Sequence, residues 1–130
     1  MGDEARRAIV RAYFAKMTAI DIDGIIAMFE PDGFVVSPFL GRMPAPDFYA
    51  KLGAASSAAT LTVHGIMGDP EAGKYAAHFR YDWTLASGED LMFEGIDLFT
   101  FGAGERFRSM EIFYDTHPLR AEVGDKYERA

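Results

Sequence analysis

The sequence predicts an α+β domain in which three N-terminal helices pack on a curved antiparallel sheet. Helical spacing of apolar residues marks the first part of the chain, and strict alternation marks the second half. Glycine-containing turns separate the alternating segments, and strands joined in this way pair antiparallel. We expect a single domain over residues 1–130, with a cone between helices and sheet whose mouth holds a ligand.

The three helices are expected before residue 56. The first runs from about Asp3 to Ile20, and its apolar stripe places Tyr13 inward, where a buried phenol needs a hydrogen-bond partner. The second helix follows a cap at residue 21 or 23 and ends at a turn formed by residues 31–33. A short strand, Phe34–Ser37, and a loop precede the third helix, Asp47–Ala55; residues 54–60 are small and predicted to be flexible.

Four strands are expected in the second half, at residues 61–67, 74–85, 91–101 and 105–114. In the first of them, Leu61, Val63 and Met67 share one parity and His64 has the other, so we expect His64 to leave the pocket unless a bulge changes the register. The second strand carries one apolar face, which predicts the core or pocket wall: Tyr75, Ala77, Phe79, Tyr81, Trp83 and Leu85.

One carboxylate stands out in the strand 91–101. Asp97 has the same parity as Phe93, Phe99 and Phe101, so its side chain points into an apolar environment. Desolvation favours the neutral acid, which is a hydrogen-bond donor. The alternative is that Asp97 lies at a sheet edge, where it reaches solvent or meets an arginine.

Composition narrows the classes of partner. The net charge is −7 without a basic cluster, so nucleic acid and membrane surfaces are not expected as partners. There is no cysteine, no metal-ligand spacing and no phosphate-binding loop, so no metal or cofactor is predicted. The N-terminus lacks a long apolar run, and we expect a cytoplasmic protein. Ile96 and Leu98 make the second face of their strand apolar too, which predicts a homodimer.

Two segments, DIDGIIAMFEPDG and IDLFTFGAGERFRSM, resemble the ketosteroid isomerases. These belong to a wider group with the SnoaL-like cyclases and nuclear transport factor two, which share a cystatin-like fold. The resemblance extends from about Val10 to His117. It implies that Asp97 and Tyr13 donate hydrogen bonds to a substrate oxyanion, and that Tyr49 supports Tyr13.

The sequence departs from these isomerases at the catalytic base. The matching position, before a proline at the end of the short strand, is Ser37, and a serine hydroxyl does not accept a carbon-bound proton at neutral pH unaided. His64 and Asp47 are the candidate substitutes. His117 is expected either at the mouth of the cone or in a surface turn.

Three functions remain open at this point. The first is an isomerase or lyase that stabilises an enolate of a small apolar carbonyl compound, without a cofactor. The second is a protein of the same fold that binds a hydrophobic carbonyl or phenolic ligand without turnover. The third is an interaction domain whose cone is filled by its own side chains. Ser37 is expected to contact a ligand. Five aromatic residues are expected either to contact a ligand or to fill the cone: Phe79, Tyr81, Trp83, Phe93 and Phe99.

Overall fold

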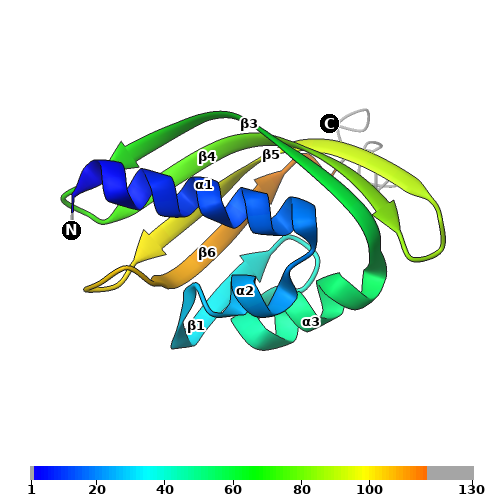
Figure 1. Ribbon diagram of the computed structural model, residues 1–130, viewed down its shortest axis with the longest axis horizontal. Coiled ribbons are helices and arrows are strands. Elements are labelled where there is room, and N and C mark those ends of the chain that lie inside the picture. Colours follow the sequence, from blue (N-terminus) through cyan, green and yellow to red (C-terminus); the bar gives the residue numbers. More distant parts are fainter. Residues whose placement is uncertain (1, 117–130) are drawn as a thin grey trace, which may run out of the picture.

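The computed structural model describes residues 2–116 and contains three helices on one face of a curved six-stranded sheet (Figure 1). The α+β fold class is therefore confirmed. The sheet order is β2-β1-β6-β5-β4-β3. The elements are α1 (Asp3–Ala19), α2 (Ile22–Ile26), β1 (Phe29–Ser37), β2 (Gly41–Pro44), α3 (Ala45–Ala55), β3 (Ser56–Asp69), β4 (Lys74–Leu85), β5 (Asp90–Phe101) and β6 (Phe107–Tyr114).

The sheet is mixed rather than wholly antiparallel. Strands β3 to β6 form a meander of antiparallel neighbours, as the turns predicted. Strand β1 instead lies parallel to β6, with Val35 opposite Met110. A parallel pair needs a long connection between its strands. Here the whole segment from β2 to β5 forms the connection between β1 and β6. No local turn in the sequence therefore marks this pairing.

Two local predictions were wrong because strand pairing overrides turn propensity. Residues 31–33 lie inside β1, where the register against β6 shifts between Phe29 and Phe34. The turn-forming residues at these positions cause an irregularity within β1 and do not mark the point where the strand begins. Residues 56–60, predicted to be flexible, form the start of β3 and pair with the end of β4, where Ser56 lies opposite Leu85. Small side chains there do not prevent backbone pairing.

The alternation of β4 and β5 places side chains as predicted. Tyr75, Ala77, Phe79 and Tyr81 are buried on the inner face, which the helices cover. From α1, Tyr13 packs edge-on against this face, 5.0 Å from Phe99 between ring centroids. Gly95 allows a close approach, because a Cβ there would lie 3.1 Å from the ring of Phe79 and 2.9 Å from the carbonyl oxygen of Phe113.

A bulge in β3 corrects the predicted faces of that strand. The register against β4 shifts between Val63 and Gly65, so His64 and Gly65 together oppose His78. Beyond the bulge the parity reverses: Ile66 packs against the core, whereas Met67 is 52% exposed. His64 itself still lies outside the cavity, as expected.

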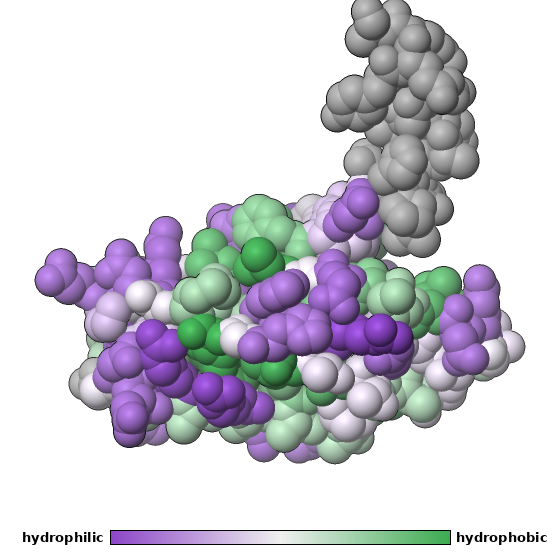
Figure 2. Space-filling model, turned by 90° about the horizontal axis from the view of Figure 1, so that it is seen from above, coloured by the Kyte–Doolittle hydropathy of each residue, from purple (hydrophilic) through white to green (hydrophobic). Residues whose placement is uncertain are grey.

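The outer face of the sheet exposes apolar side chains. Met92, Ile96 and Phe113 are 54%, 39% and 50% exposed, and all three belong to β5 or β6. Figure 2 shows one side of the molecule, on which hydrophobic patches lie among hydrophilic residues. No helix within residues 2–116 is long and apolar enough to cross a membrane. The homodimer stays a prediction, for which these side chains are the expected contact.

Sedimentation equilibrium tests the homodimer. We expect twice the chain mass of 14.4 kDa, and a shift toward the single chain when Ile96 and Phe113 are both replaced by Lys, because buried charges without partners oppose association. Ala50→Lys, on the exposed side of α3, is the control and should leave the mass unchanged. A wild-type protein that sediments as a single chain at all concentrations contradicts the prediction.

Candidate functional site

A cavity of about 700 Å³ opens between α3, the end of β1 and the inner face of the sheet. Its volume lies in the range of sites for small molecules, so the cone is not filled by its own side chains. Most of its wall is apolar. Four of the aromatic residues predicted to contact a ligand line it: Phe79, Tyr81, Trp83 and Phe93.

Tyr13 and Tyr49 form a pair of buried phenols. Their hydroxyl oxygens are 2.7 Å apart, and Tyr49 is fully buried behind the cavity while Tyr13 lines it. Either hydroxyl can donate in this hydrogen bond; when Tyr49 donates to Tyr13, the Tyr13 proton is free for a second acceptor. Burial raises the pKa of both phenols well above the ordinary value, and the neighbouring phenol and Asp97 add to the effect on Tyr13. Both are therefore neutral donors at physiological pH.

Asp97 lies in the middle of the sheet, not at an edge. Its strand β5 pairs with β4 on one side and β6 on the other, and Asp97 stands opposite Ala77 and Ile112. The side chain is 4% exposed, and its Oδ1 atom has no hydrogen-bond partner among the described residues. Burial raises the pKa of this carboxyl well above its usual range. The structure thus favours a protonated acid that faces the same cavity as Tyr13.

Ser37 lines the cavity near its rim, at the end of β1. Its Oγ atom accepts a hydrogen bond of 3.2 Å from the backbone N–H of Leu40, which closes the turn into β2. The hydroxyl therefore already has a structural role. An acidic side chain in place of Ser37 would project from the cavity wall.

Tyr49 and Phe99 lie behind the wall rather than in it. Phe99 is fully buried and packs 5.0 Å from Tyr13 and 4.7 Å from Phe107, measured between ring centroids. It packs against the Tyr13 ring and does not line the cavity. Tyr49 acts on the cavity through its hydrogen bond to Tyr13.

The structure brings neither candidate base to the cavity. Asp47 is exposed in the first turn of α3, and His64 lies on the outer face of the sheet. His117 lies outside the described residues. Among residues 2–116, Asp97 is the one carboxylate that lines the cavity, and no imidazole does; the other titratable lining groups are Lys51 and three tyrosines.

Sequence reasoning missed part of the cavity wall. Phe39 and Leu40, about half exposed, project from the turn after β1, and Lys51 comes from α3. Ile112 and Tyr114 line the cavity from β6, with the Tyr114 ring 4.6 Å from that of Phe93. Ile112 and Tyr114 have the same parity in the last strand, and this pattern could have predicted that both face the cavity. The other three lie in a turn and a short helix, where local pattern does not predict a wall.

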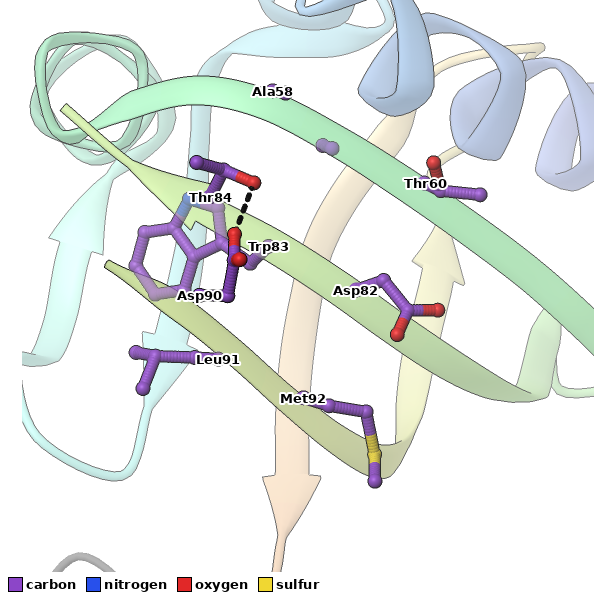
Figure 3. Close-up of a pocket in the computed structure, with 9 residues that line it drawn as sticks. Ala58, Thr60, Asp82, Trp83, Thr84, Asp90, Leu91 and Met92 are labelled. Carbon is purple, nitrogen blue, oxygen red and sulfur yellow. Dashed lines mark hydrogen bonds between the residues drawn. The ribbon is translucent and has the colours of Figure 1, made fainter. Parts of the chain in front are cut away.

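A second, smaller hollow of about 360 Å³ lies over β3, β4 and β5 and shares the lining residue Trp83 with the main cavity (Figure 3). Its polar lining comes from alternate residues such as Thr60, Asp82 and Thr84. The Thr84 hydroxyl donates a 2.7 Å hydrogen bond to Asp90 across the strand pair. None of these polar residues lines the main cavity, so they add no donor to it.

Comparison with known proteins identifies the fold. No family model matches the chain, and no curated protein matches it. Among solved structures, a protein of unknown function with a cystatin-like fold from Methylobium petroleophilum PM1 has a TM-score of 0.74 and 18% identity, over 88% of this chain and 78% of that one. A hypothetical protein with a ketosteroid isomerase-like fold from Catenulispora acidiphila DSM 44928, in complex with trimethylamine, has a TM-score of 0.73 and 18% identity, over 89% and 92%. The chain has this fold.

A third neighbour with the same fold is an enzyme. The epoxide hydrolase/cyclase-like enzyme SalBIII, described for pyran ring formation in the polyether salinomycin, has a TM-score of 0.77 and 19% identity, over 88% of this chain and 95% of that one. Other matches are described as NTF2-like, after nuclear transport factor two. The resemblance inferred from the two sequence segments is confirmed at the level of the fold.

Burial of Asp97 predicts how stability changes with pH. Its pKa in the folded state is raised above the ordinary value of 3.8, so between about pH 4 and the folded pKa the folded state holds a proton that the unfolded state has lost. The free energy of unfolding then falls as pH rises, by up to about 1.4 kcal/mol per unit from this group. Asp97→Asn removes this contribution, so its stability relative to wild type should increase from pH 4 upward and then level off.

Urea unfolding of both proteins across this range measures the difference. Asp47→Asn is the matched control, because it makes the same substitution at an exposed carboxyl outside the cavity. A constant difference between Asp97→Asn and wild type throughout the range would mean that Asp97 is charged in the folded protein.

Proposed function

We propose that the cavity binds a small, mostly apolar molecule that carries a carbonyl or phenolic oxygen, and that Tyr13 and Asp97 both donate hydrogen bonds to this oxygen. The observation that carries the proposal is Asp97, a buried acid with an unpartnered oxygen in the wall of an apolar cavity. A buried polar atom without a partner costs free energy, which a ligand oxygen would recover. Tyr13, oriented by Tyr49, is the second donor at the same cavity.

Two neutral donors directed at one oxygen favour enolate chemistry. When a base removes a proton from the carbon next to a carbonyl, negative charge develops on the oxygen, and the donors stabilise it. The proton then returns to another carbon, which is isomerisation, or a leaving group departs, which is elimination. One such donor contributes about 3 kcal/mol to transition-state stability. No cofactor enters this reaction. The fold, shared with an epoxide hydrolase/cyclase-like enzyme, is compatible with such a site.

Binding without turnover is the second candidate. It is favoured by Ser37 at the position where the resemblance implies a base, and by the lack of another carboxylate or imidazole among the described lining residues. In this case the two donors recognise a ligand oxygen and no proton is moved. The two functions share the oxygen site and differ in the base.

Binding of a naphthol tests the oxygen site. We expect Tyr13→Phe and Asp97→Leu each to weaken binding at least about tenfold, because a hydrogen bond to a partly charged oxygen contributes about 1.5–3 kcal/mol. Fluorescence titration gives the dissociation constants. Tyr75→Phe is the matched control: it also removes a phenol hydroxyl, but that group donates to Asp3 outside the cavity. Equal affinity in all four proteins would remove Tyr13 and Asp97 from the site.

Replacing Ser37 by Asp tests the reaction. With a carboxylate at the rim, isomerisation of a β,γ-unsaturated ketone should rise by about 10²–10⁴-fold over wild type, the usual contribution of a general base. Ser37→Ala loses the same hydroxyl without adding a carboxylate and should show no gain. A wild type that already isomerises the ketone efficiently argues against the binding-only function. If Ser37→Asp shows no gain while still binding the naphthol, the proposed orientation of the ligand is wrong.

A further inference from the structure

Two histidines and a glutamate meet on the outer face of the sheet, on the side opposite the cavity. His64 comes from β3, His78 from β4 and Glu94 from β5, so each of three adjacent strands contributes one side chain. One ligand-type atom from each residue lies within 4.8 Å of the other two. They are separated by 14 and 16 positions in the sequence, and only strand pairing brings them together.

The geometry of this cluster is close to that of a metal site. The Nε2 atom of His64 is 2.8 Å from Oε1 of Glu94, and Nε2 of His78 is 3.6 Å from the same oxygen. Ligand atoms around a tetrahedral zinc ion, with bonds of about 2.0–2.1 Å, are roughly 3.4 Å apart. All three side chains are partly exposed. Small rotations about their side-chain bonds would therefore bring the ligand atoms to the spacing that zinc requires, without moving the backbone.

The pairing of β3 with β4 brings the two histidines together: Val63 lies opposite Phe79, so the next residue, His64, comes beside His78. His64 and Gly65 are opposed by the single residue His78, and the imidazole rings of His64 and His78 lie 4.8 Å apart between centroids. Apart from its chain neighbours, a Cβ added at Gly65 would have no atom within 4 Å, so the backbone next to His64 is not packed against another segment there. The register shift of β3 begins at this point, and bulges are frequent next to sites of function.

The Glu94 carboxylate can bind the two histidines because Arg80, the cationic side chain opposite it, pairs with another acid. Arg80 is its direct partner across the β4–β5 pair. The Arg80 guanidinium instead binds Asp82, with Nε 3.0 Å from one carboxylate oxygen and Nη2 3.0 Å from the other. The Glu94 carboxylate therefore faces two imidazoles, and no salt bridge to Arg80 has to break when a cation binds.

We propose that His64, His78 and Glu94 form a binding site for a late first-row divalent cation, with Zn²⁺ as the representative ion. Two imidazole nitrogens and one carboxylate oxygen suit zinc, copper or nickel, whereas magnesium and calcium require oxygen ligands. Three protein ligands leave a coordination position open to solvent or to another molecule. The bound ion would join β3, β4 and β5, and the net charge of −7 favours cations in general.

Calorimetric titration of tag-free protein with ZnCl₂ is the direct test. We expect saturable binding of one zinc per chain, and no saturable binding of MgCl₂. His64→Ala, His78→Ala and Glu94→Gln should each weaken zinc binding at least about tenfold, since loss of a direct ligand exceeds the usual effect of losing an outer contact. The thermal midpoint should rise with zinc in wild type and not in the double variant His64→Ala/His78→Ala.

Two controls make the test specific to this cluster. Glu111→Gln removes a carboxylate from β6, outside the cluster, and should leave the affinity within about twofold of wild type. His117→Ala removes the remaining histidine of the chain and should have no effect either. Circular dichroism confirms folding of each variant, and sedimentation with and without zinc separates binding from any change in association.

The outcomes are distinct. Loss of zinc binding in the three cluster variants, with both controls unchanged, supports the site. Unchanged zinc binding in the double variant, binding that depends on His117, or no saturable binding by the wild type in the submillimolar range would each overturn it. None of these results depends on the ligand of the inner cavity.

Discussion

A buried carboxyl group without a charged partner is the constraint on which the rest of the site depends. Asp97 lies in a central strand, 4% exposed, with one oxygen unpartnered among the described residues. An ionised carboxylate there would need a cation or several hydrogen bonds, and the surroundings are instead aromatic. Protonation of the Asp97 carboxyl removes the charge and is the simplest way to bury this group. The same neutralisation turns the acid into a donor, so a cost in stability and a capacity for recognition have one origin.

The aromatic core around this group determines its geometry. Tyr13 is held at its ring by Phe14 and Phe99 and at its hydroxyl by Tyr49, whose own phenol is fully buried. Rigid side chains with few rotatable bonds lose little entropy on ordering, and edge-to-face ring packing fixes their orientation. Phe99 and Tyr49 therefore position the Tyr13 side chain without lining the cavity. This distinction between wall and support is the main refinement that the structure makes to the predicted site.

The two faces of the same strands carry different chemistry. Inward residues of β4 and β5 form an apolar wall around one acid, whereas outward residues of β3, β4 and β5 bring together two histidines and a glutamate. Since side chains alternate along a strand, a substitution on one face need not disturb the other. The outer cluster and the inner cavity are thus structurally separable, although both are built on β3, β4 and β5.

In α1, β4 and β5, sequence pattern alone determined which side chains share a face. The parity of Asp97 with Phe93 and Phe99, and the stripe that turns Tyr13 inward, follow from the periods of strand and helix, which are local properties of the backbone. The tertiary structure alone decided the parallel pairing of β1 with β6, the bulge at residue 64, the open volume of the cavity and the absence of Asp47 from it. These depend on which distant segments pair and in what register. That choice is made by the burial of the whole apolar surface at once, and no window of the sequence contains it.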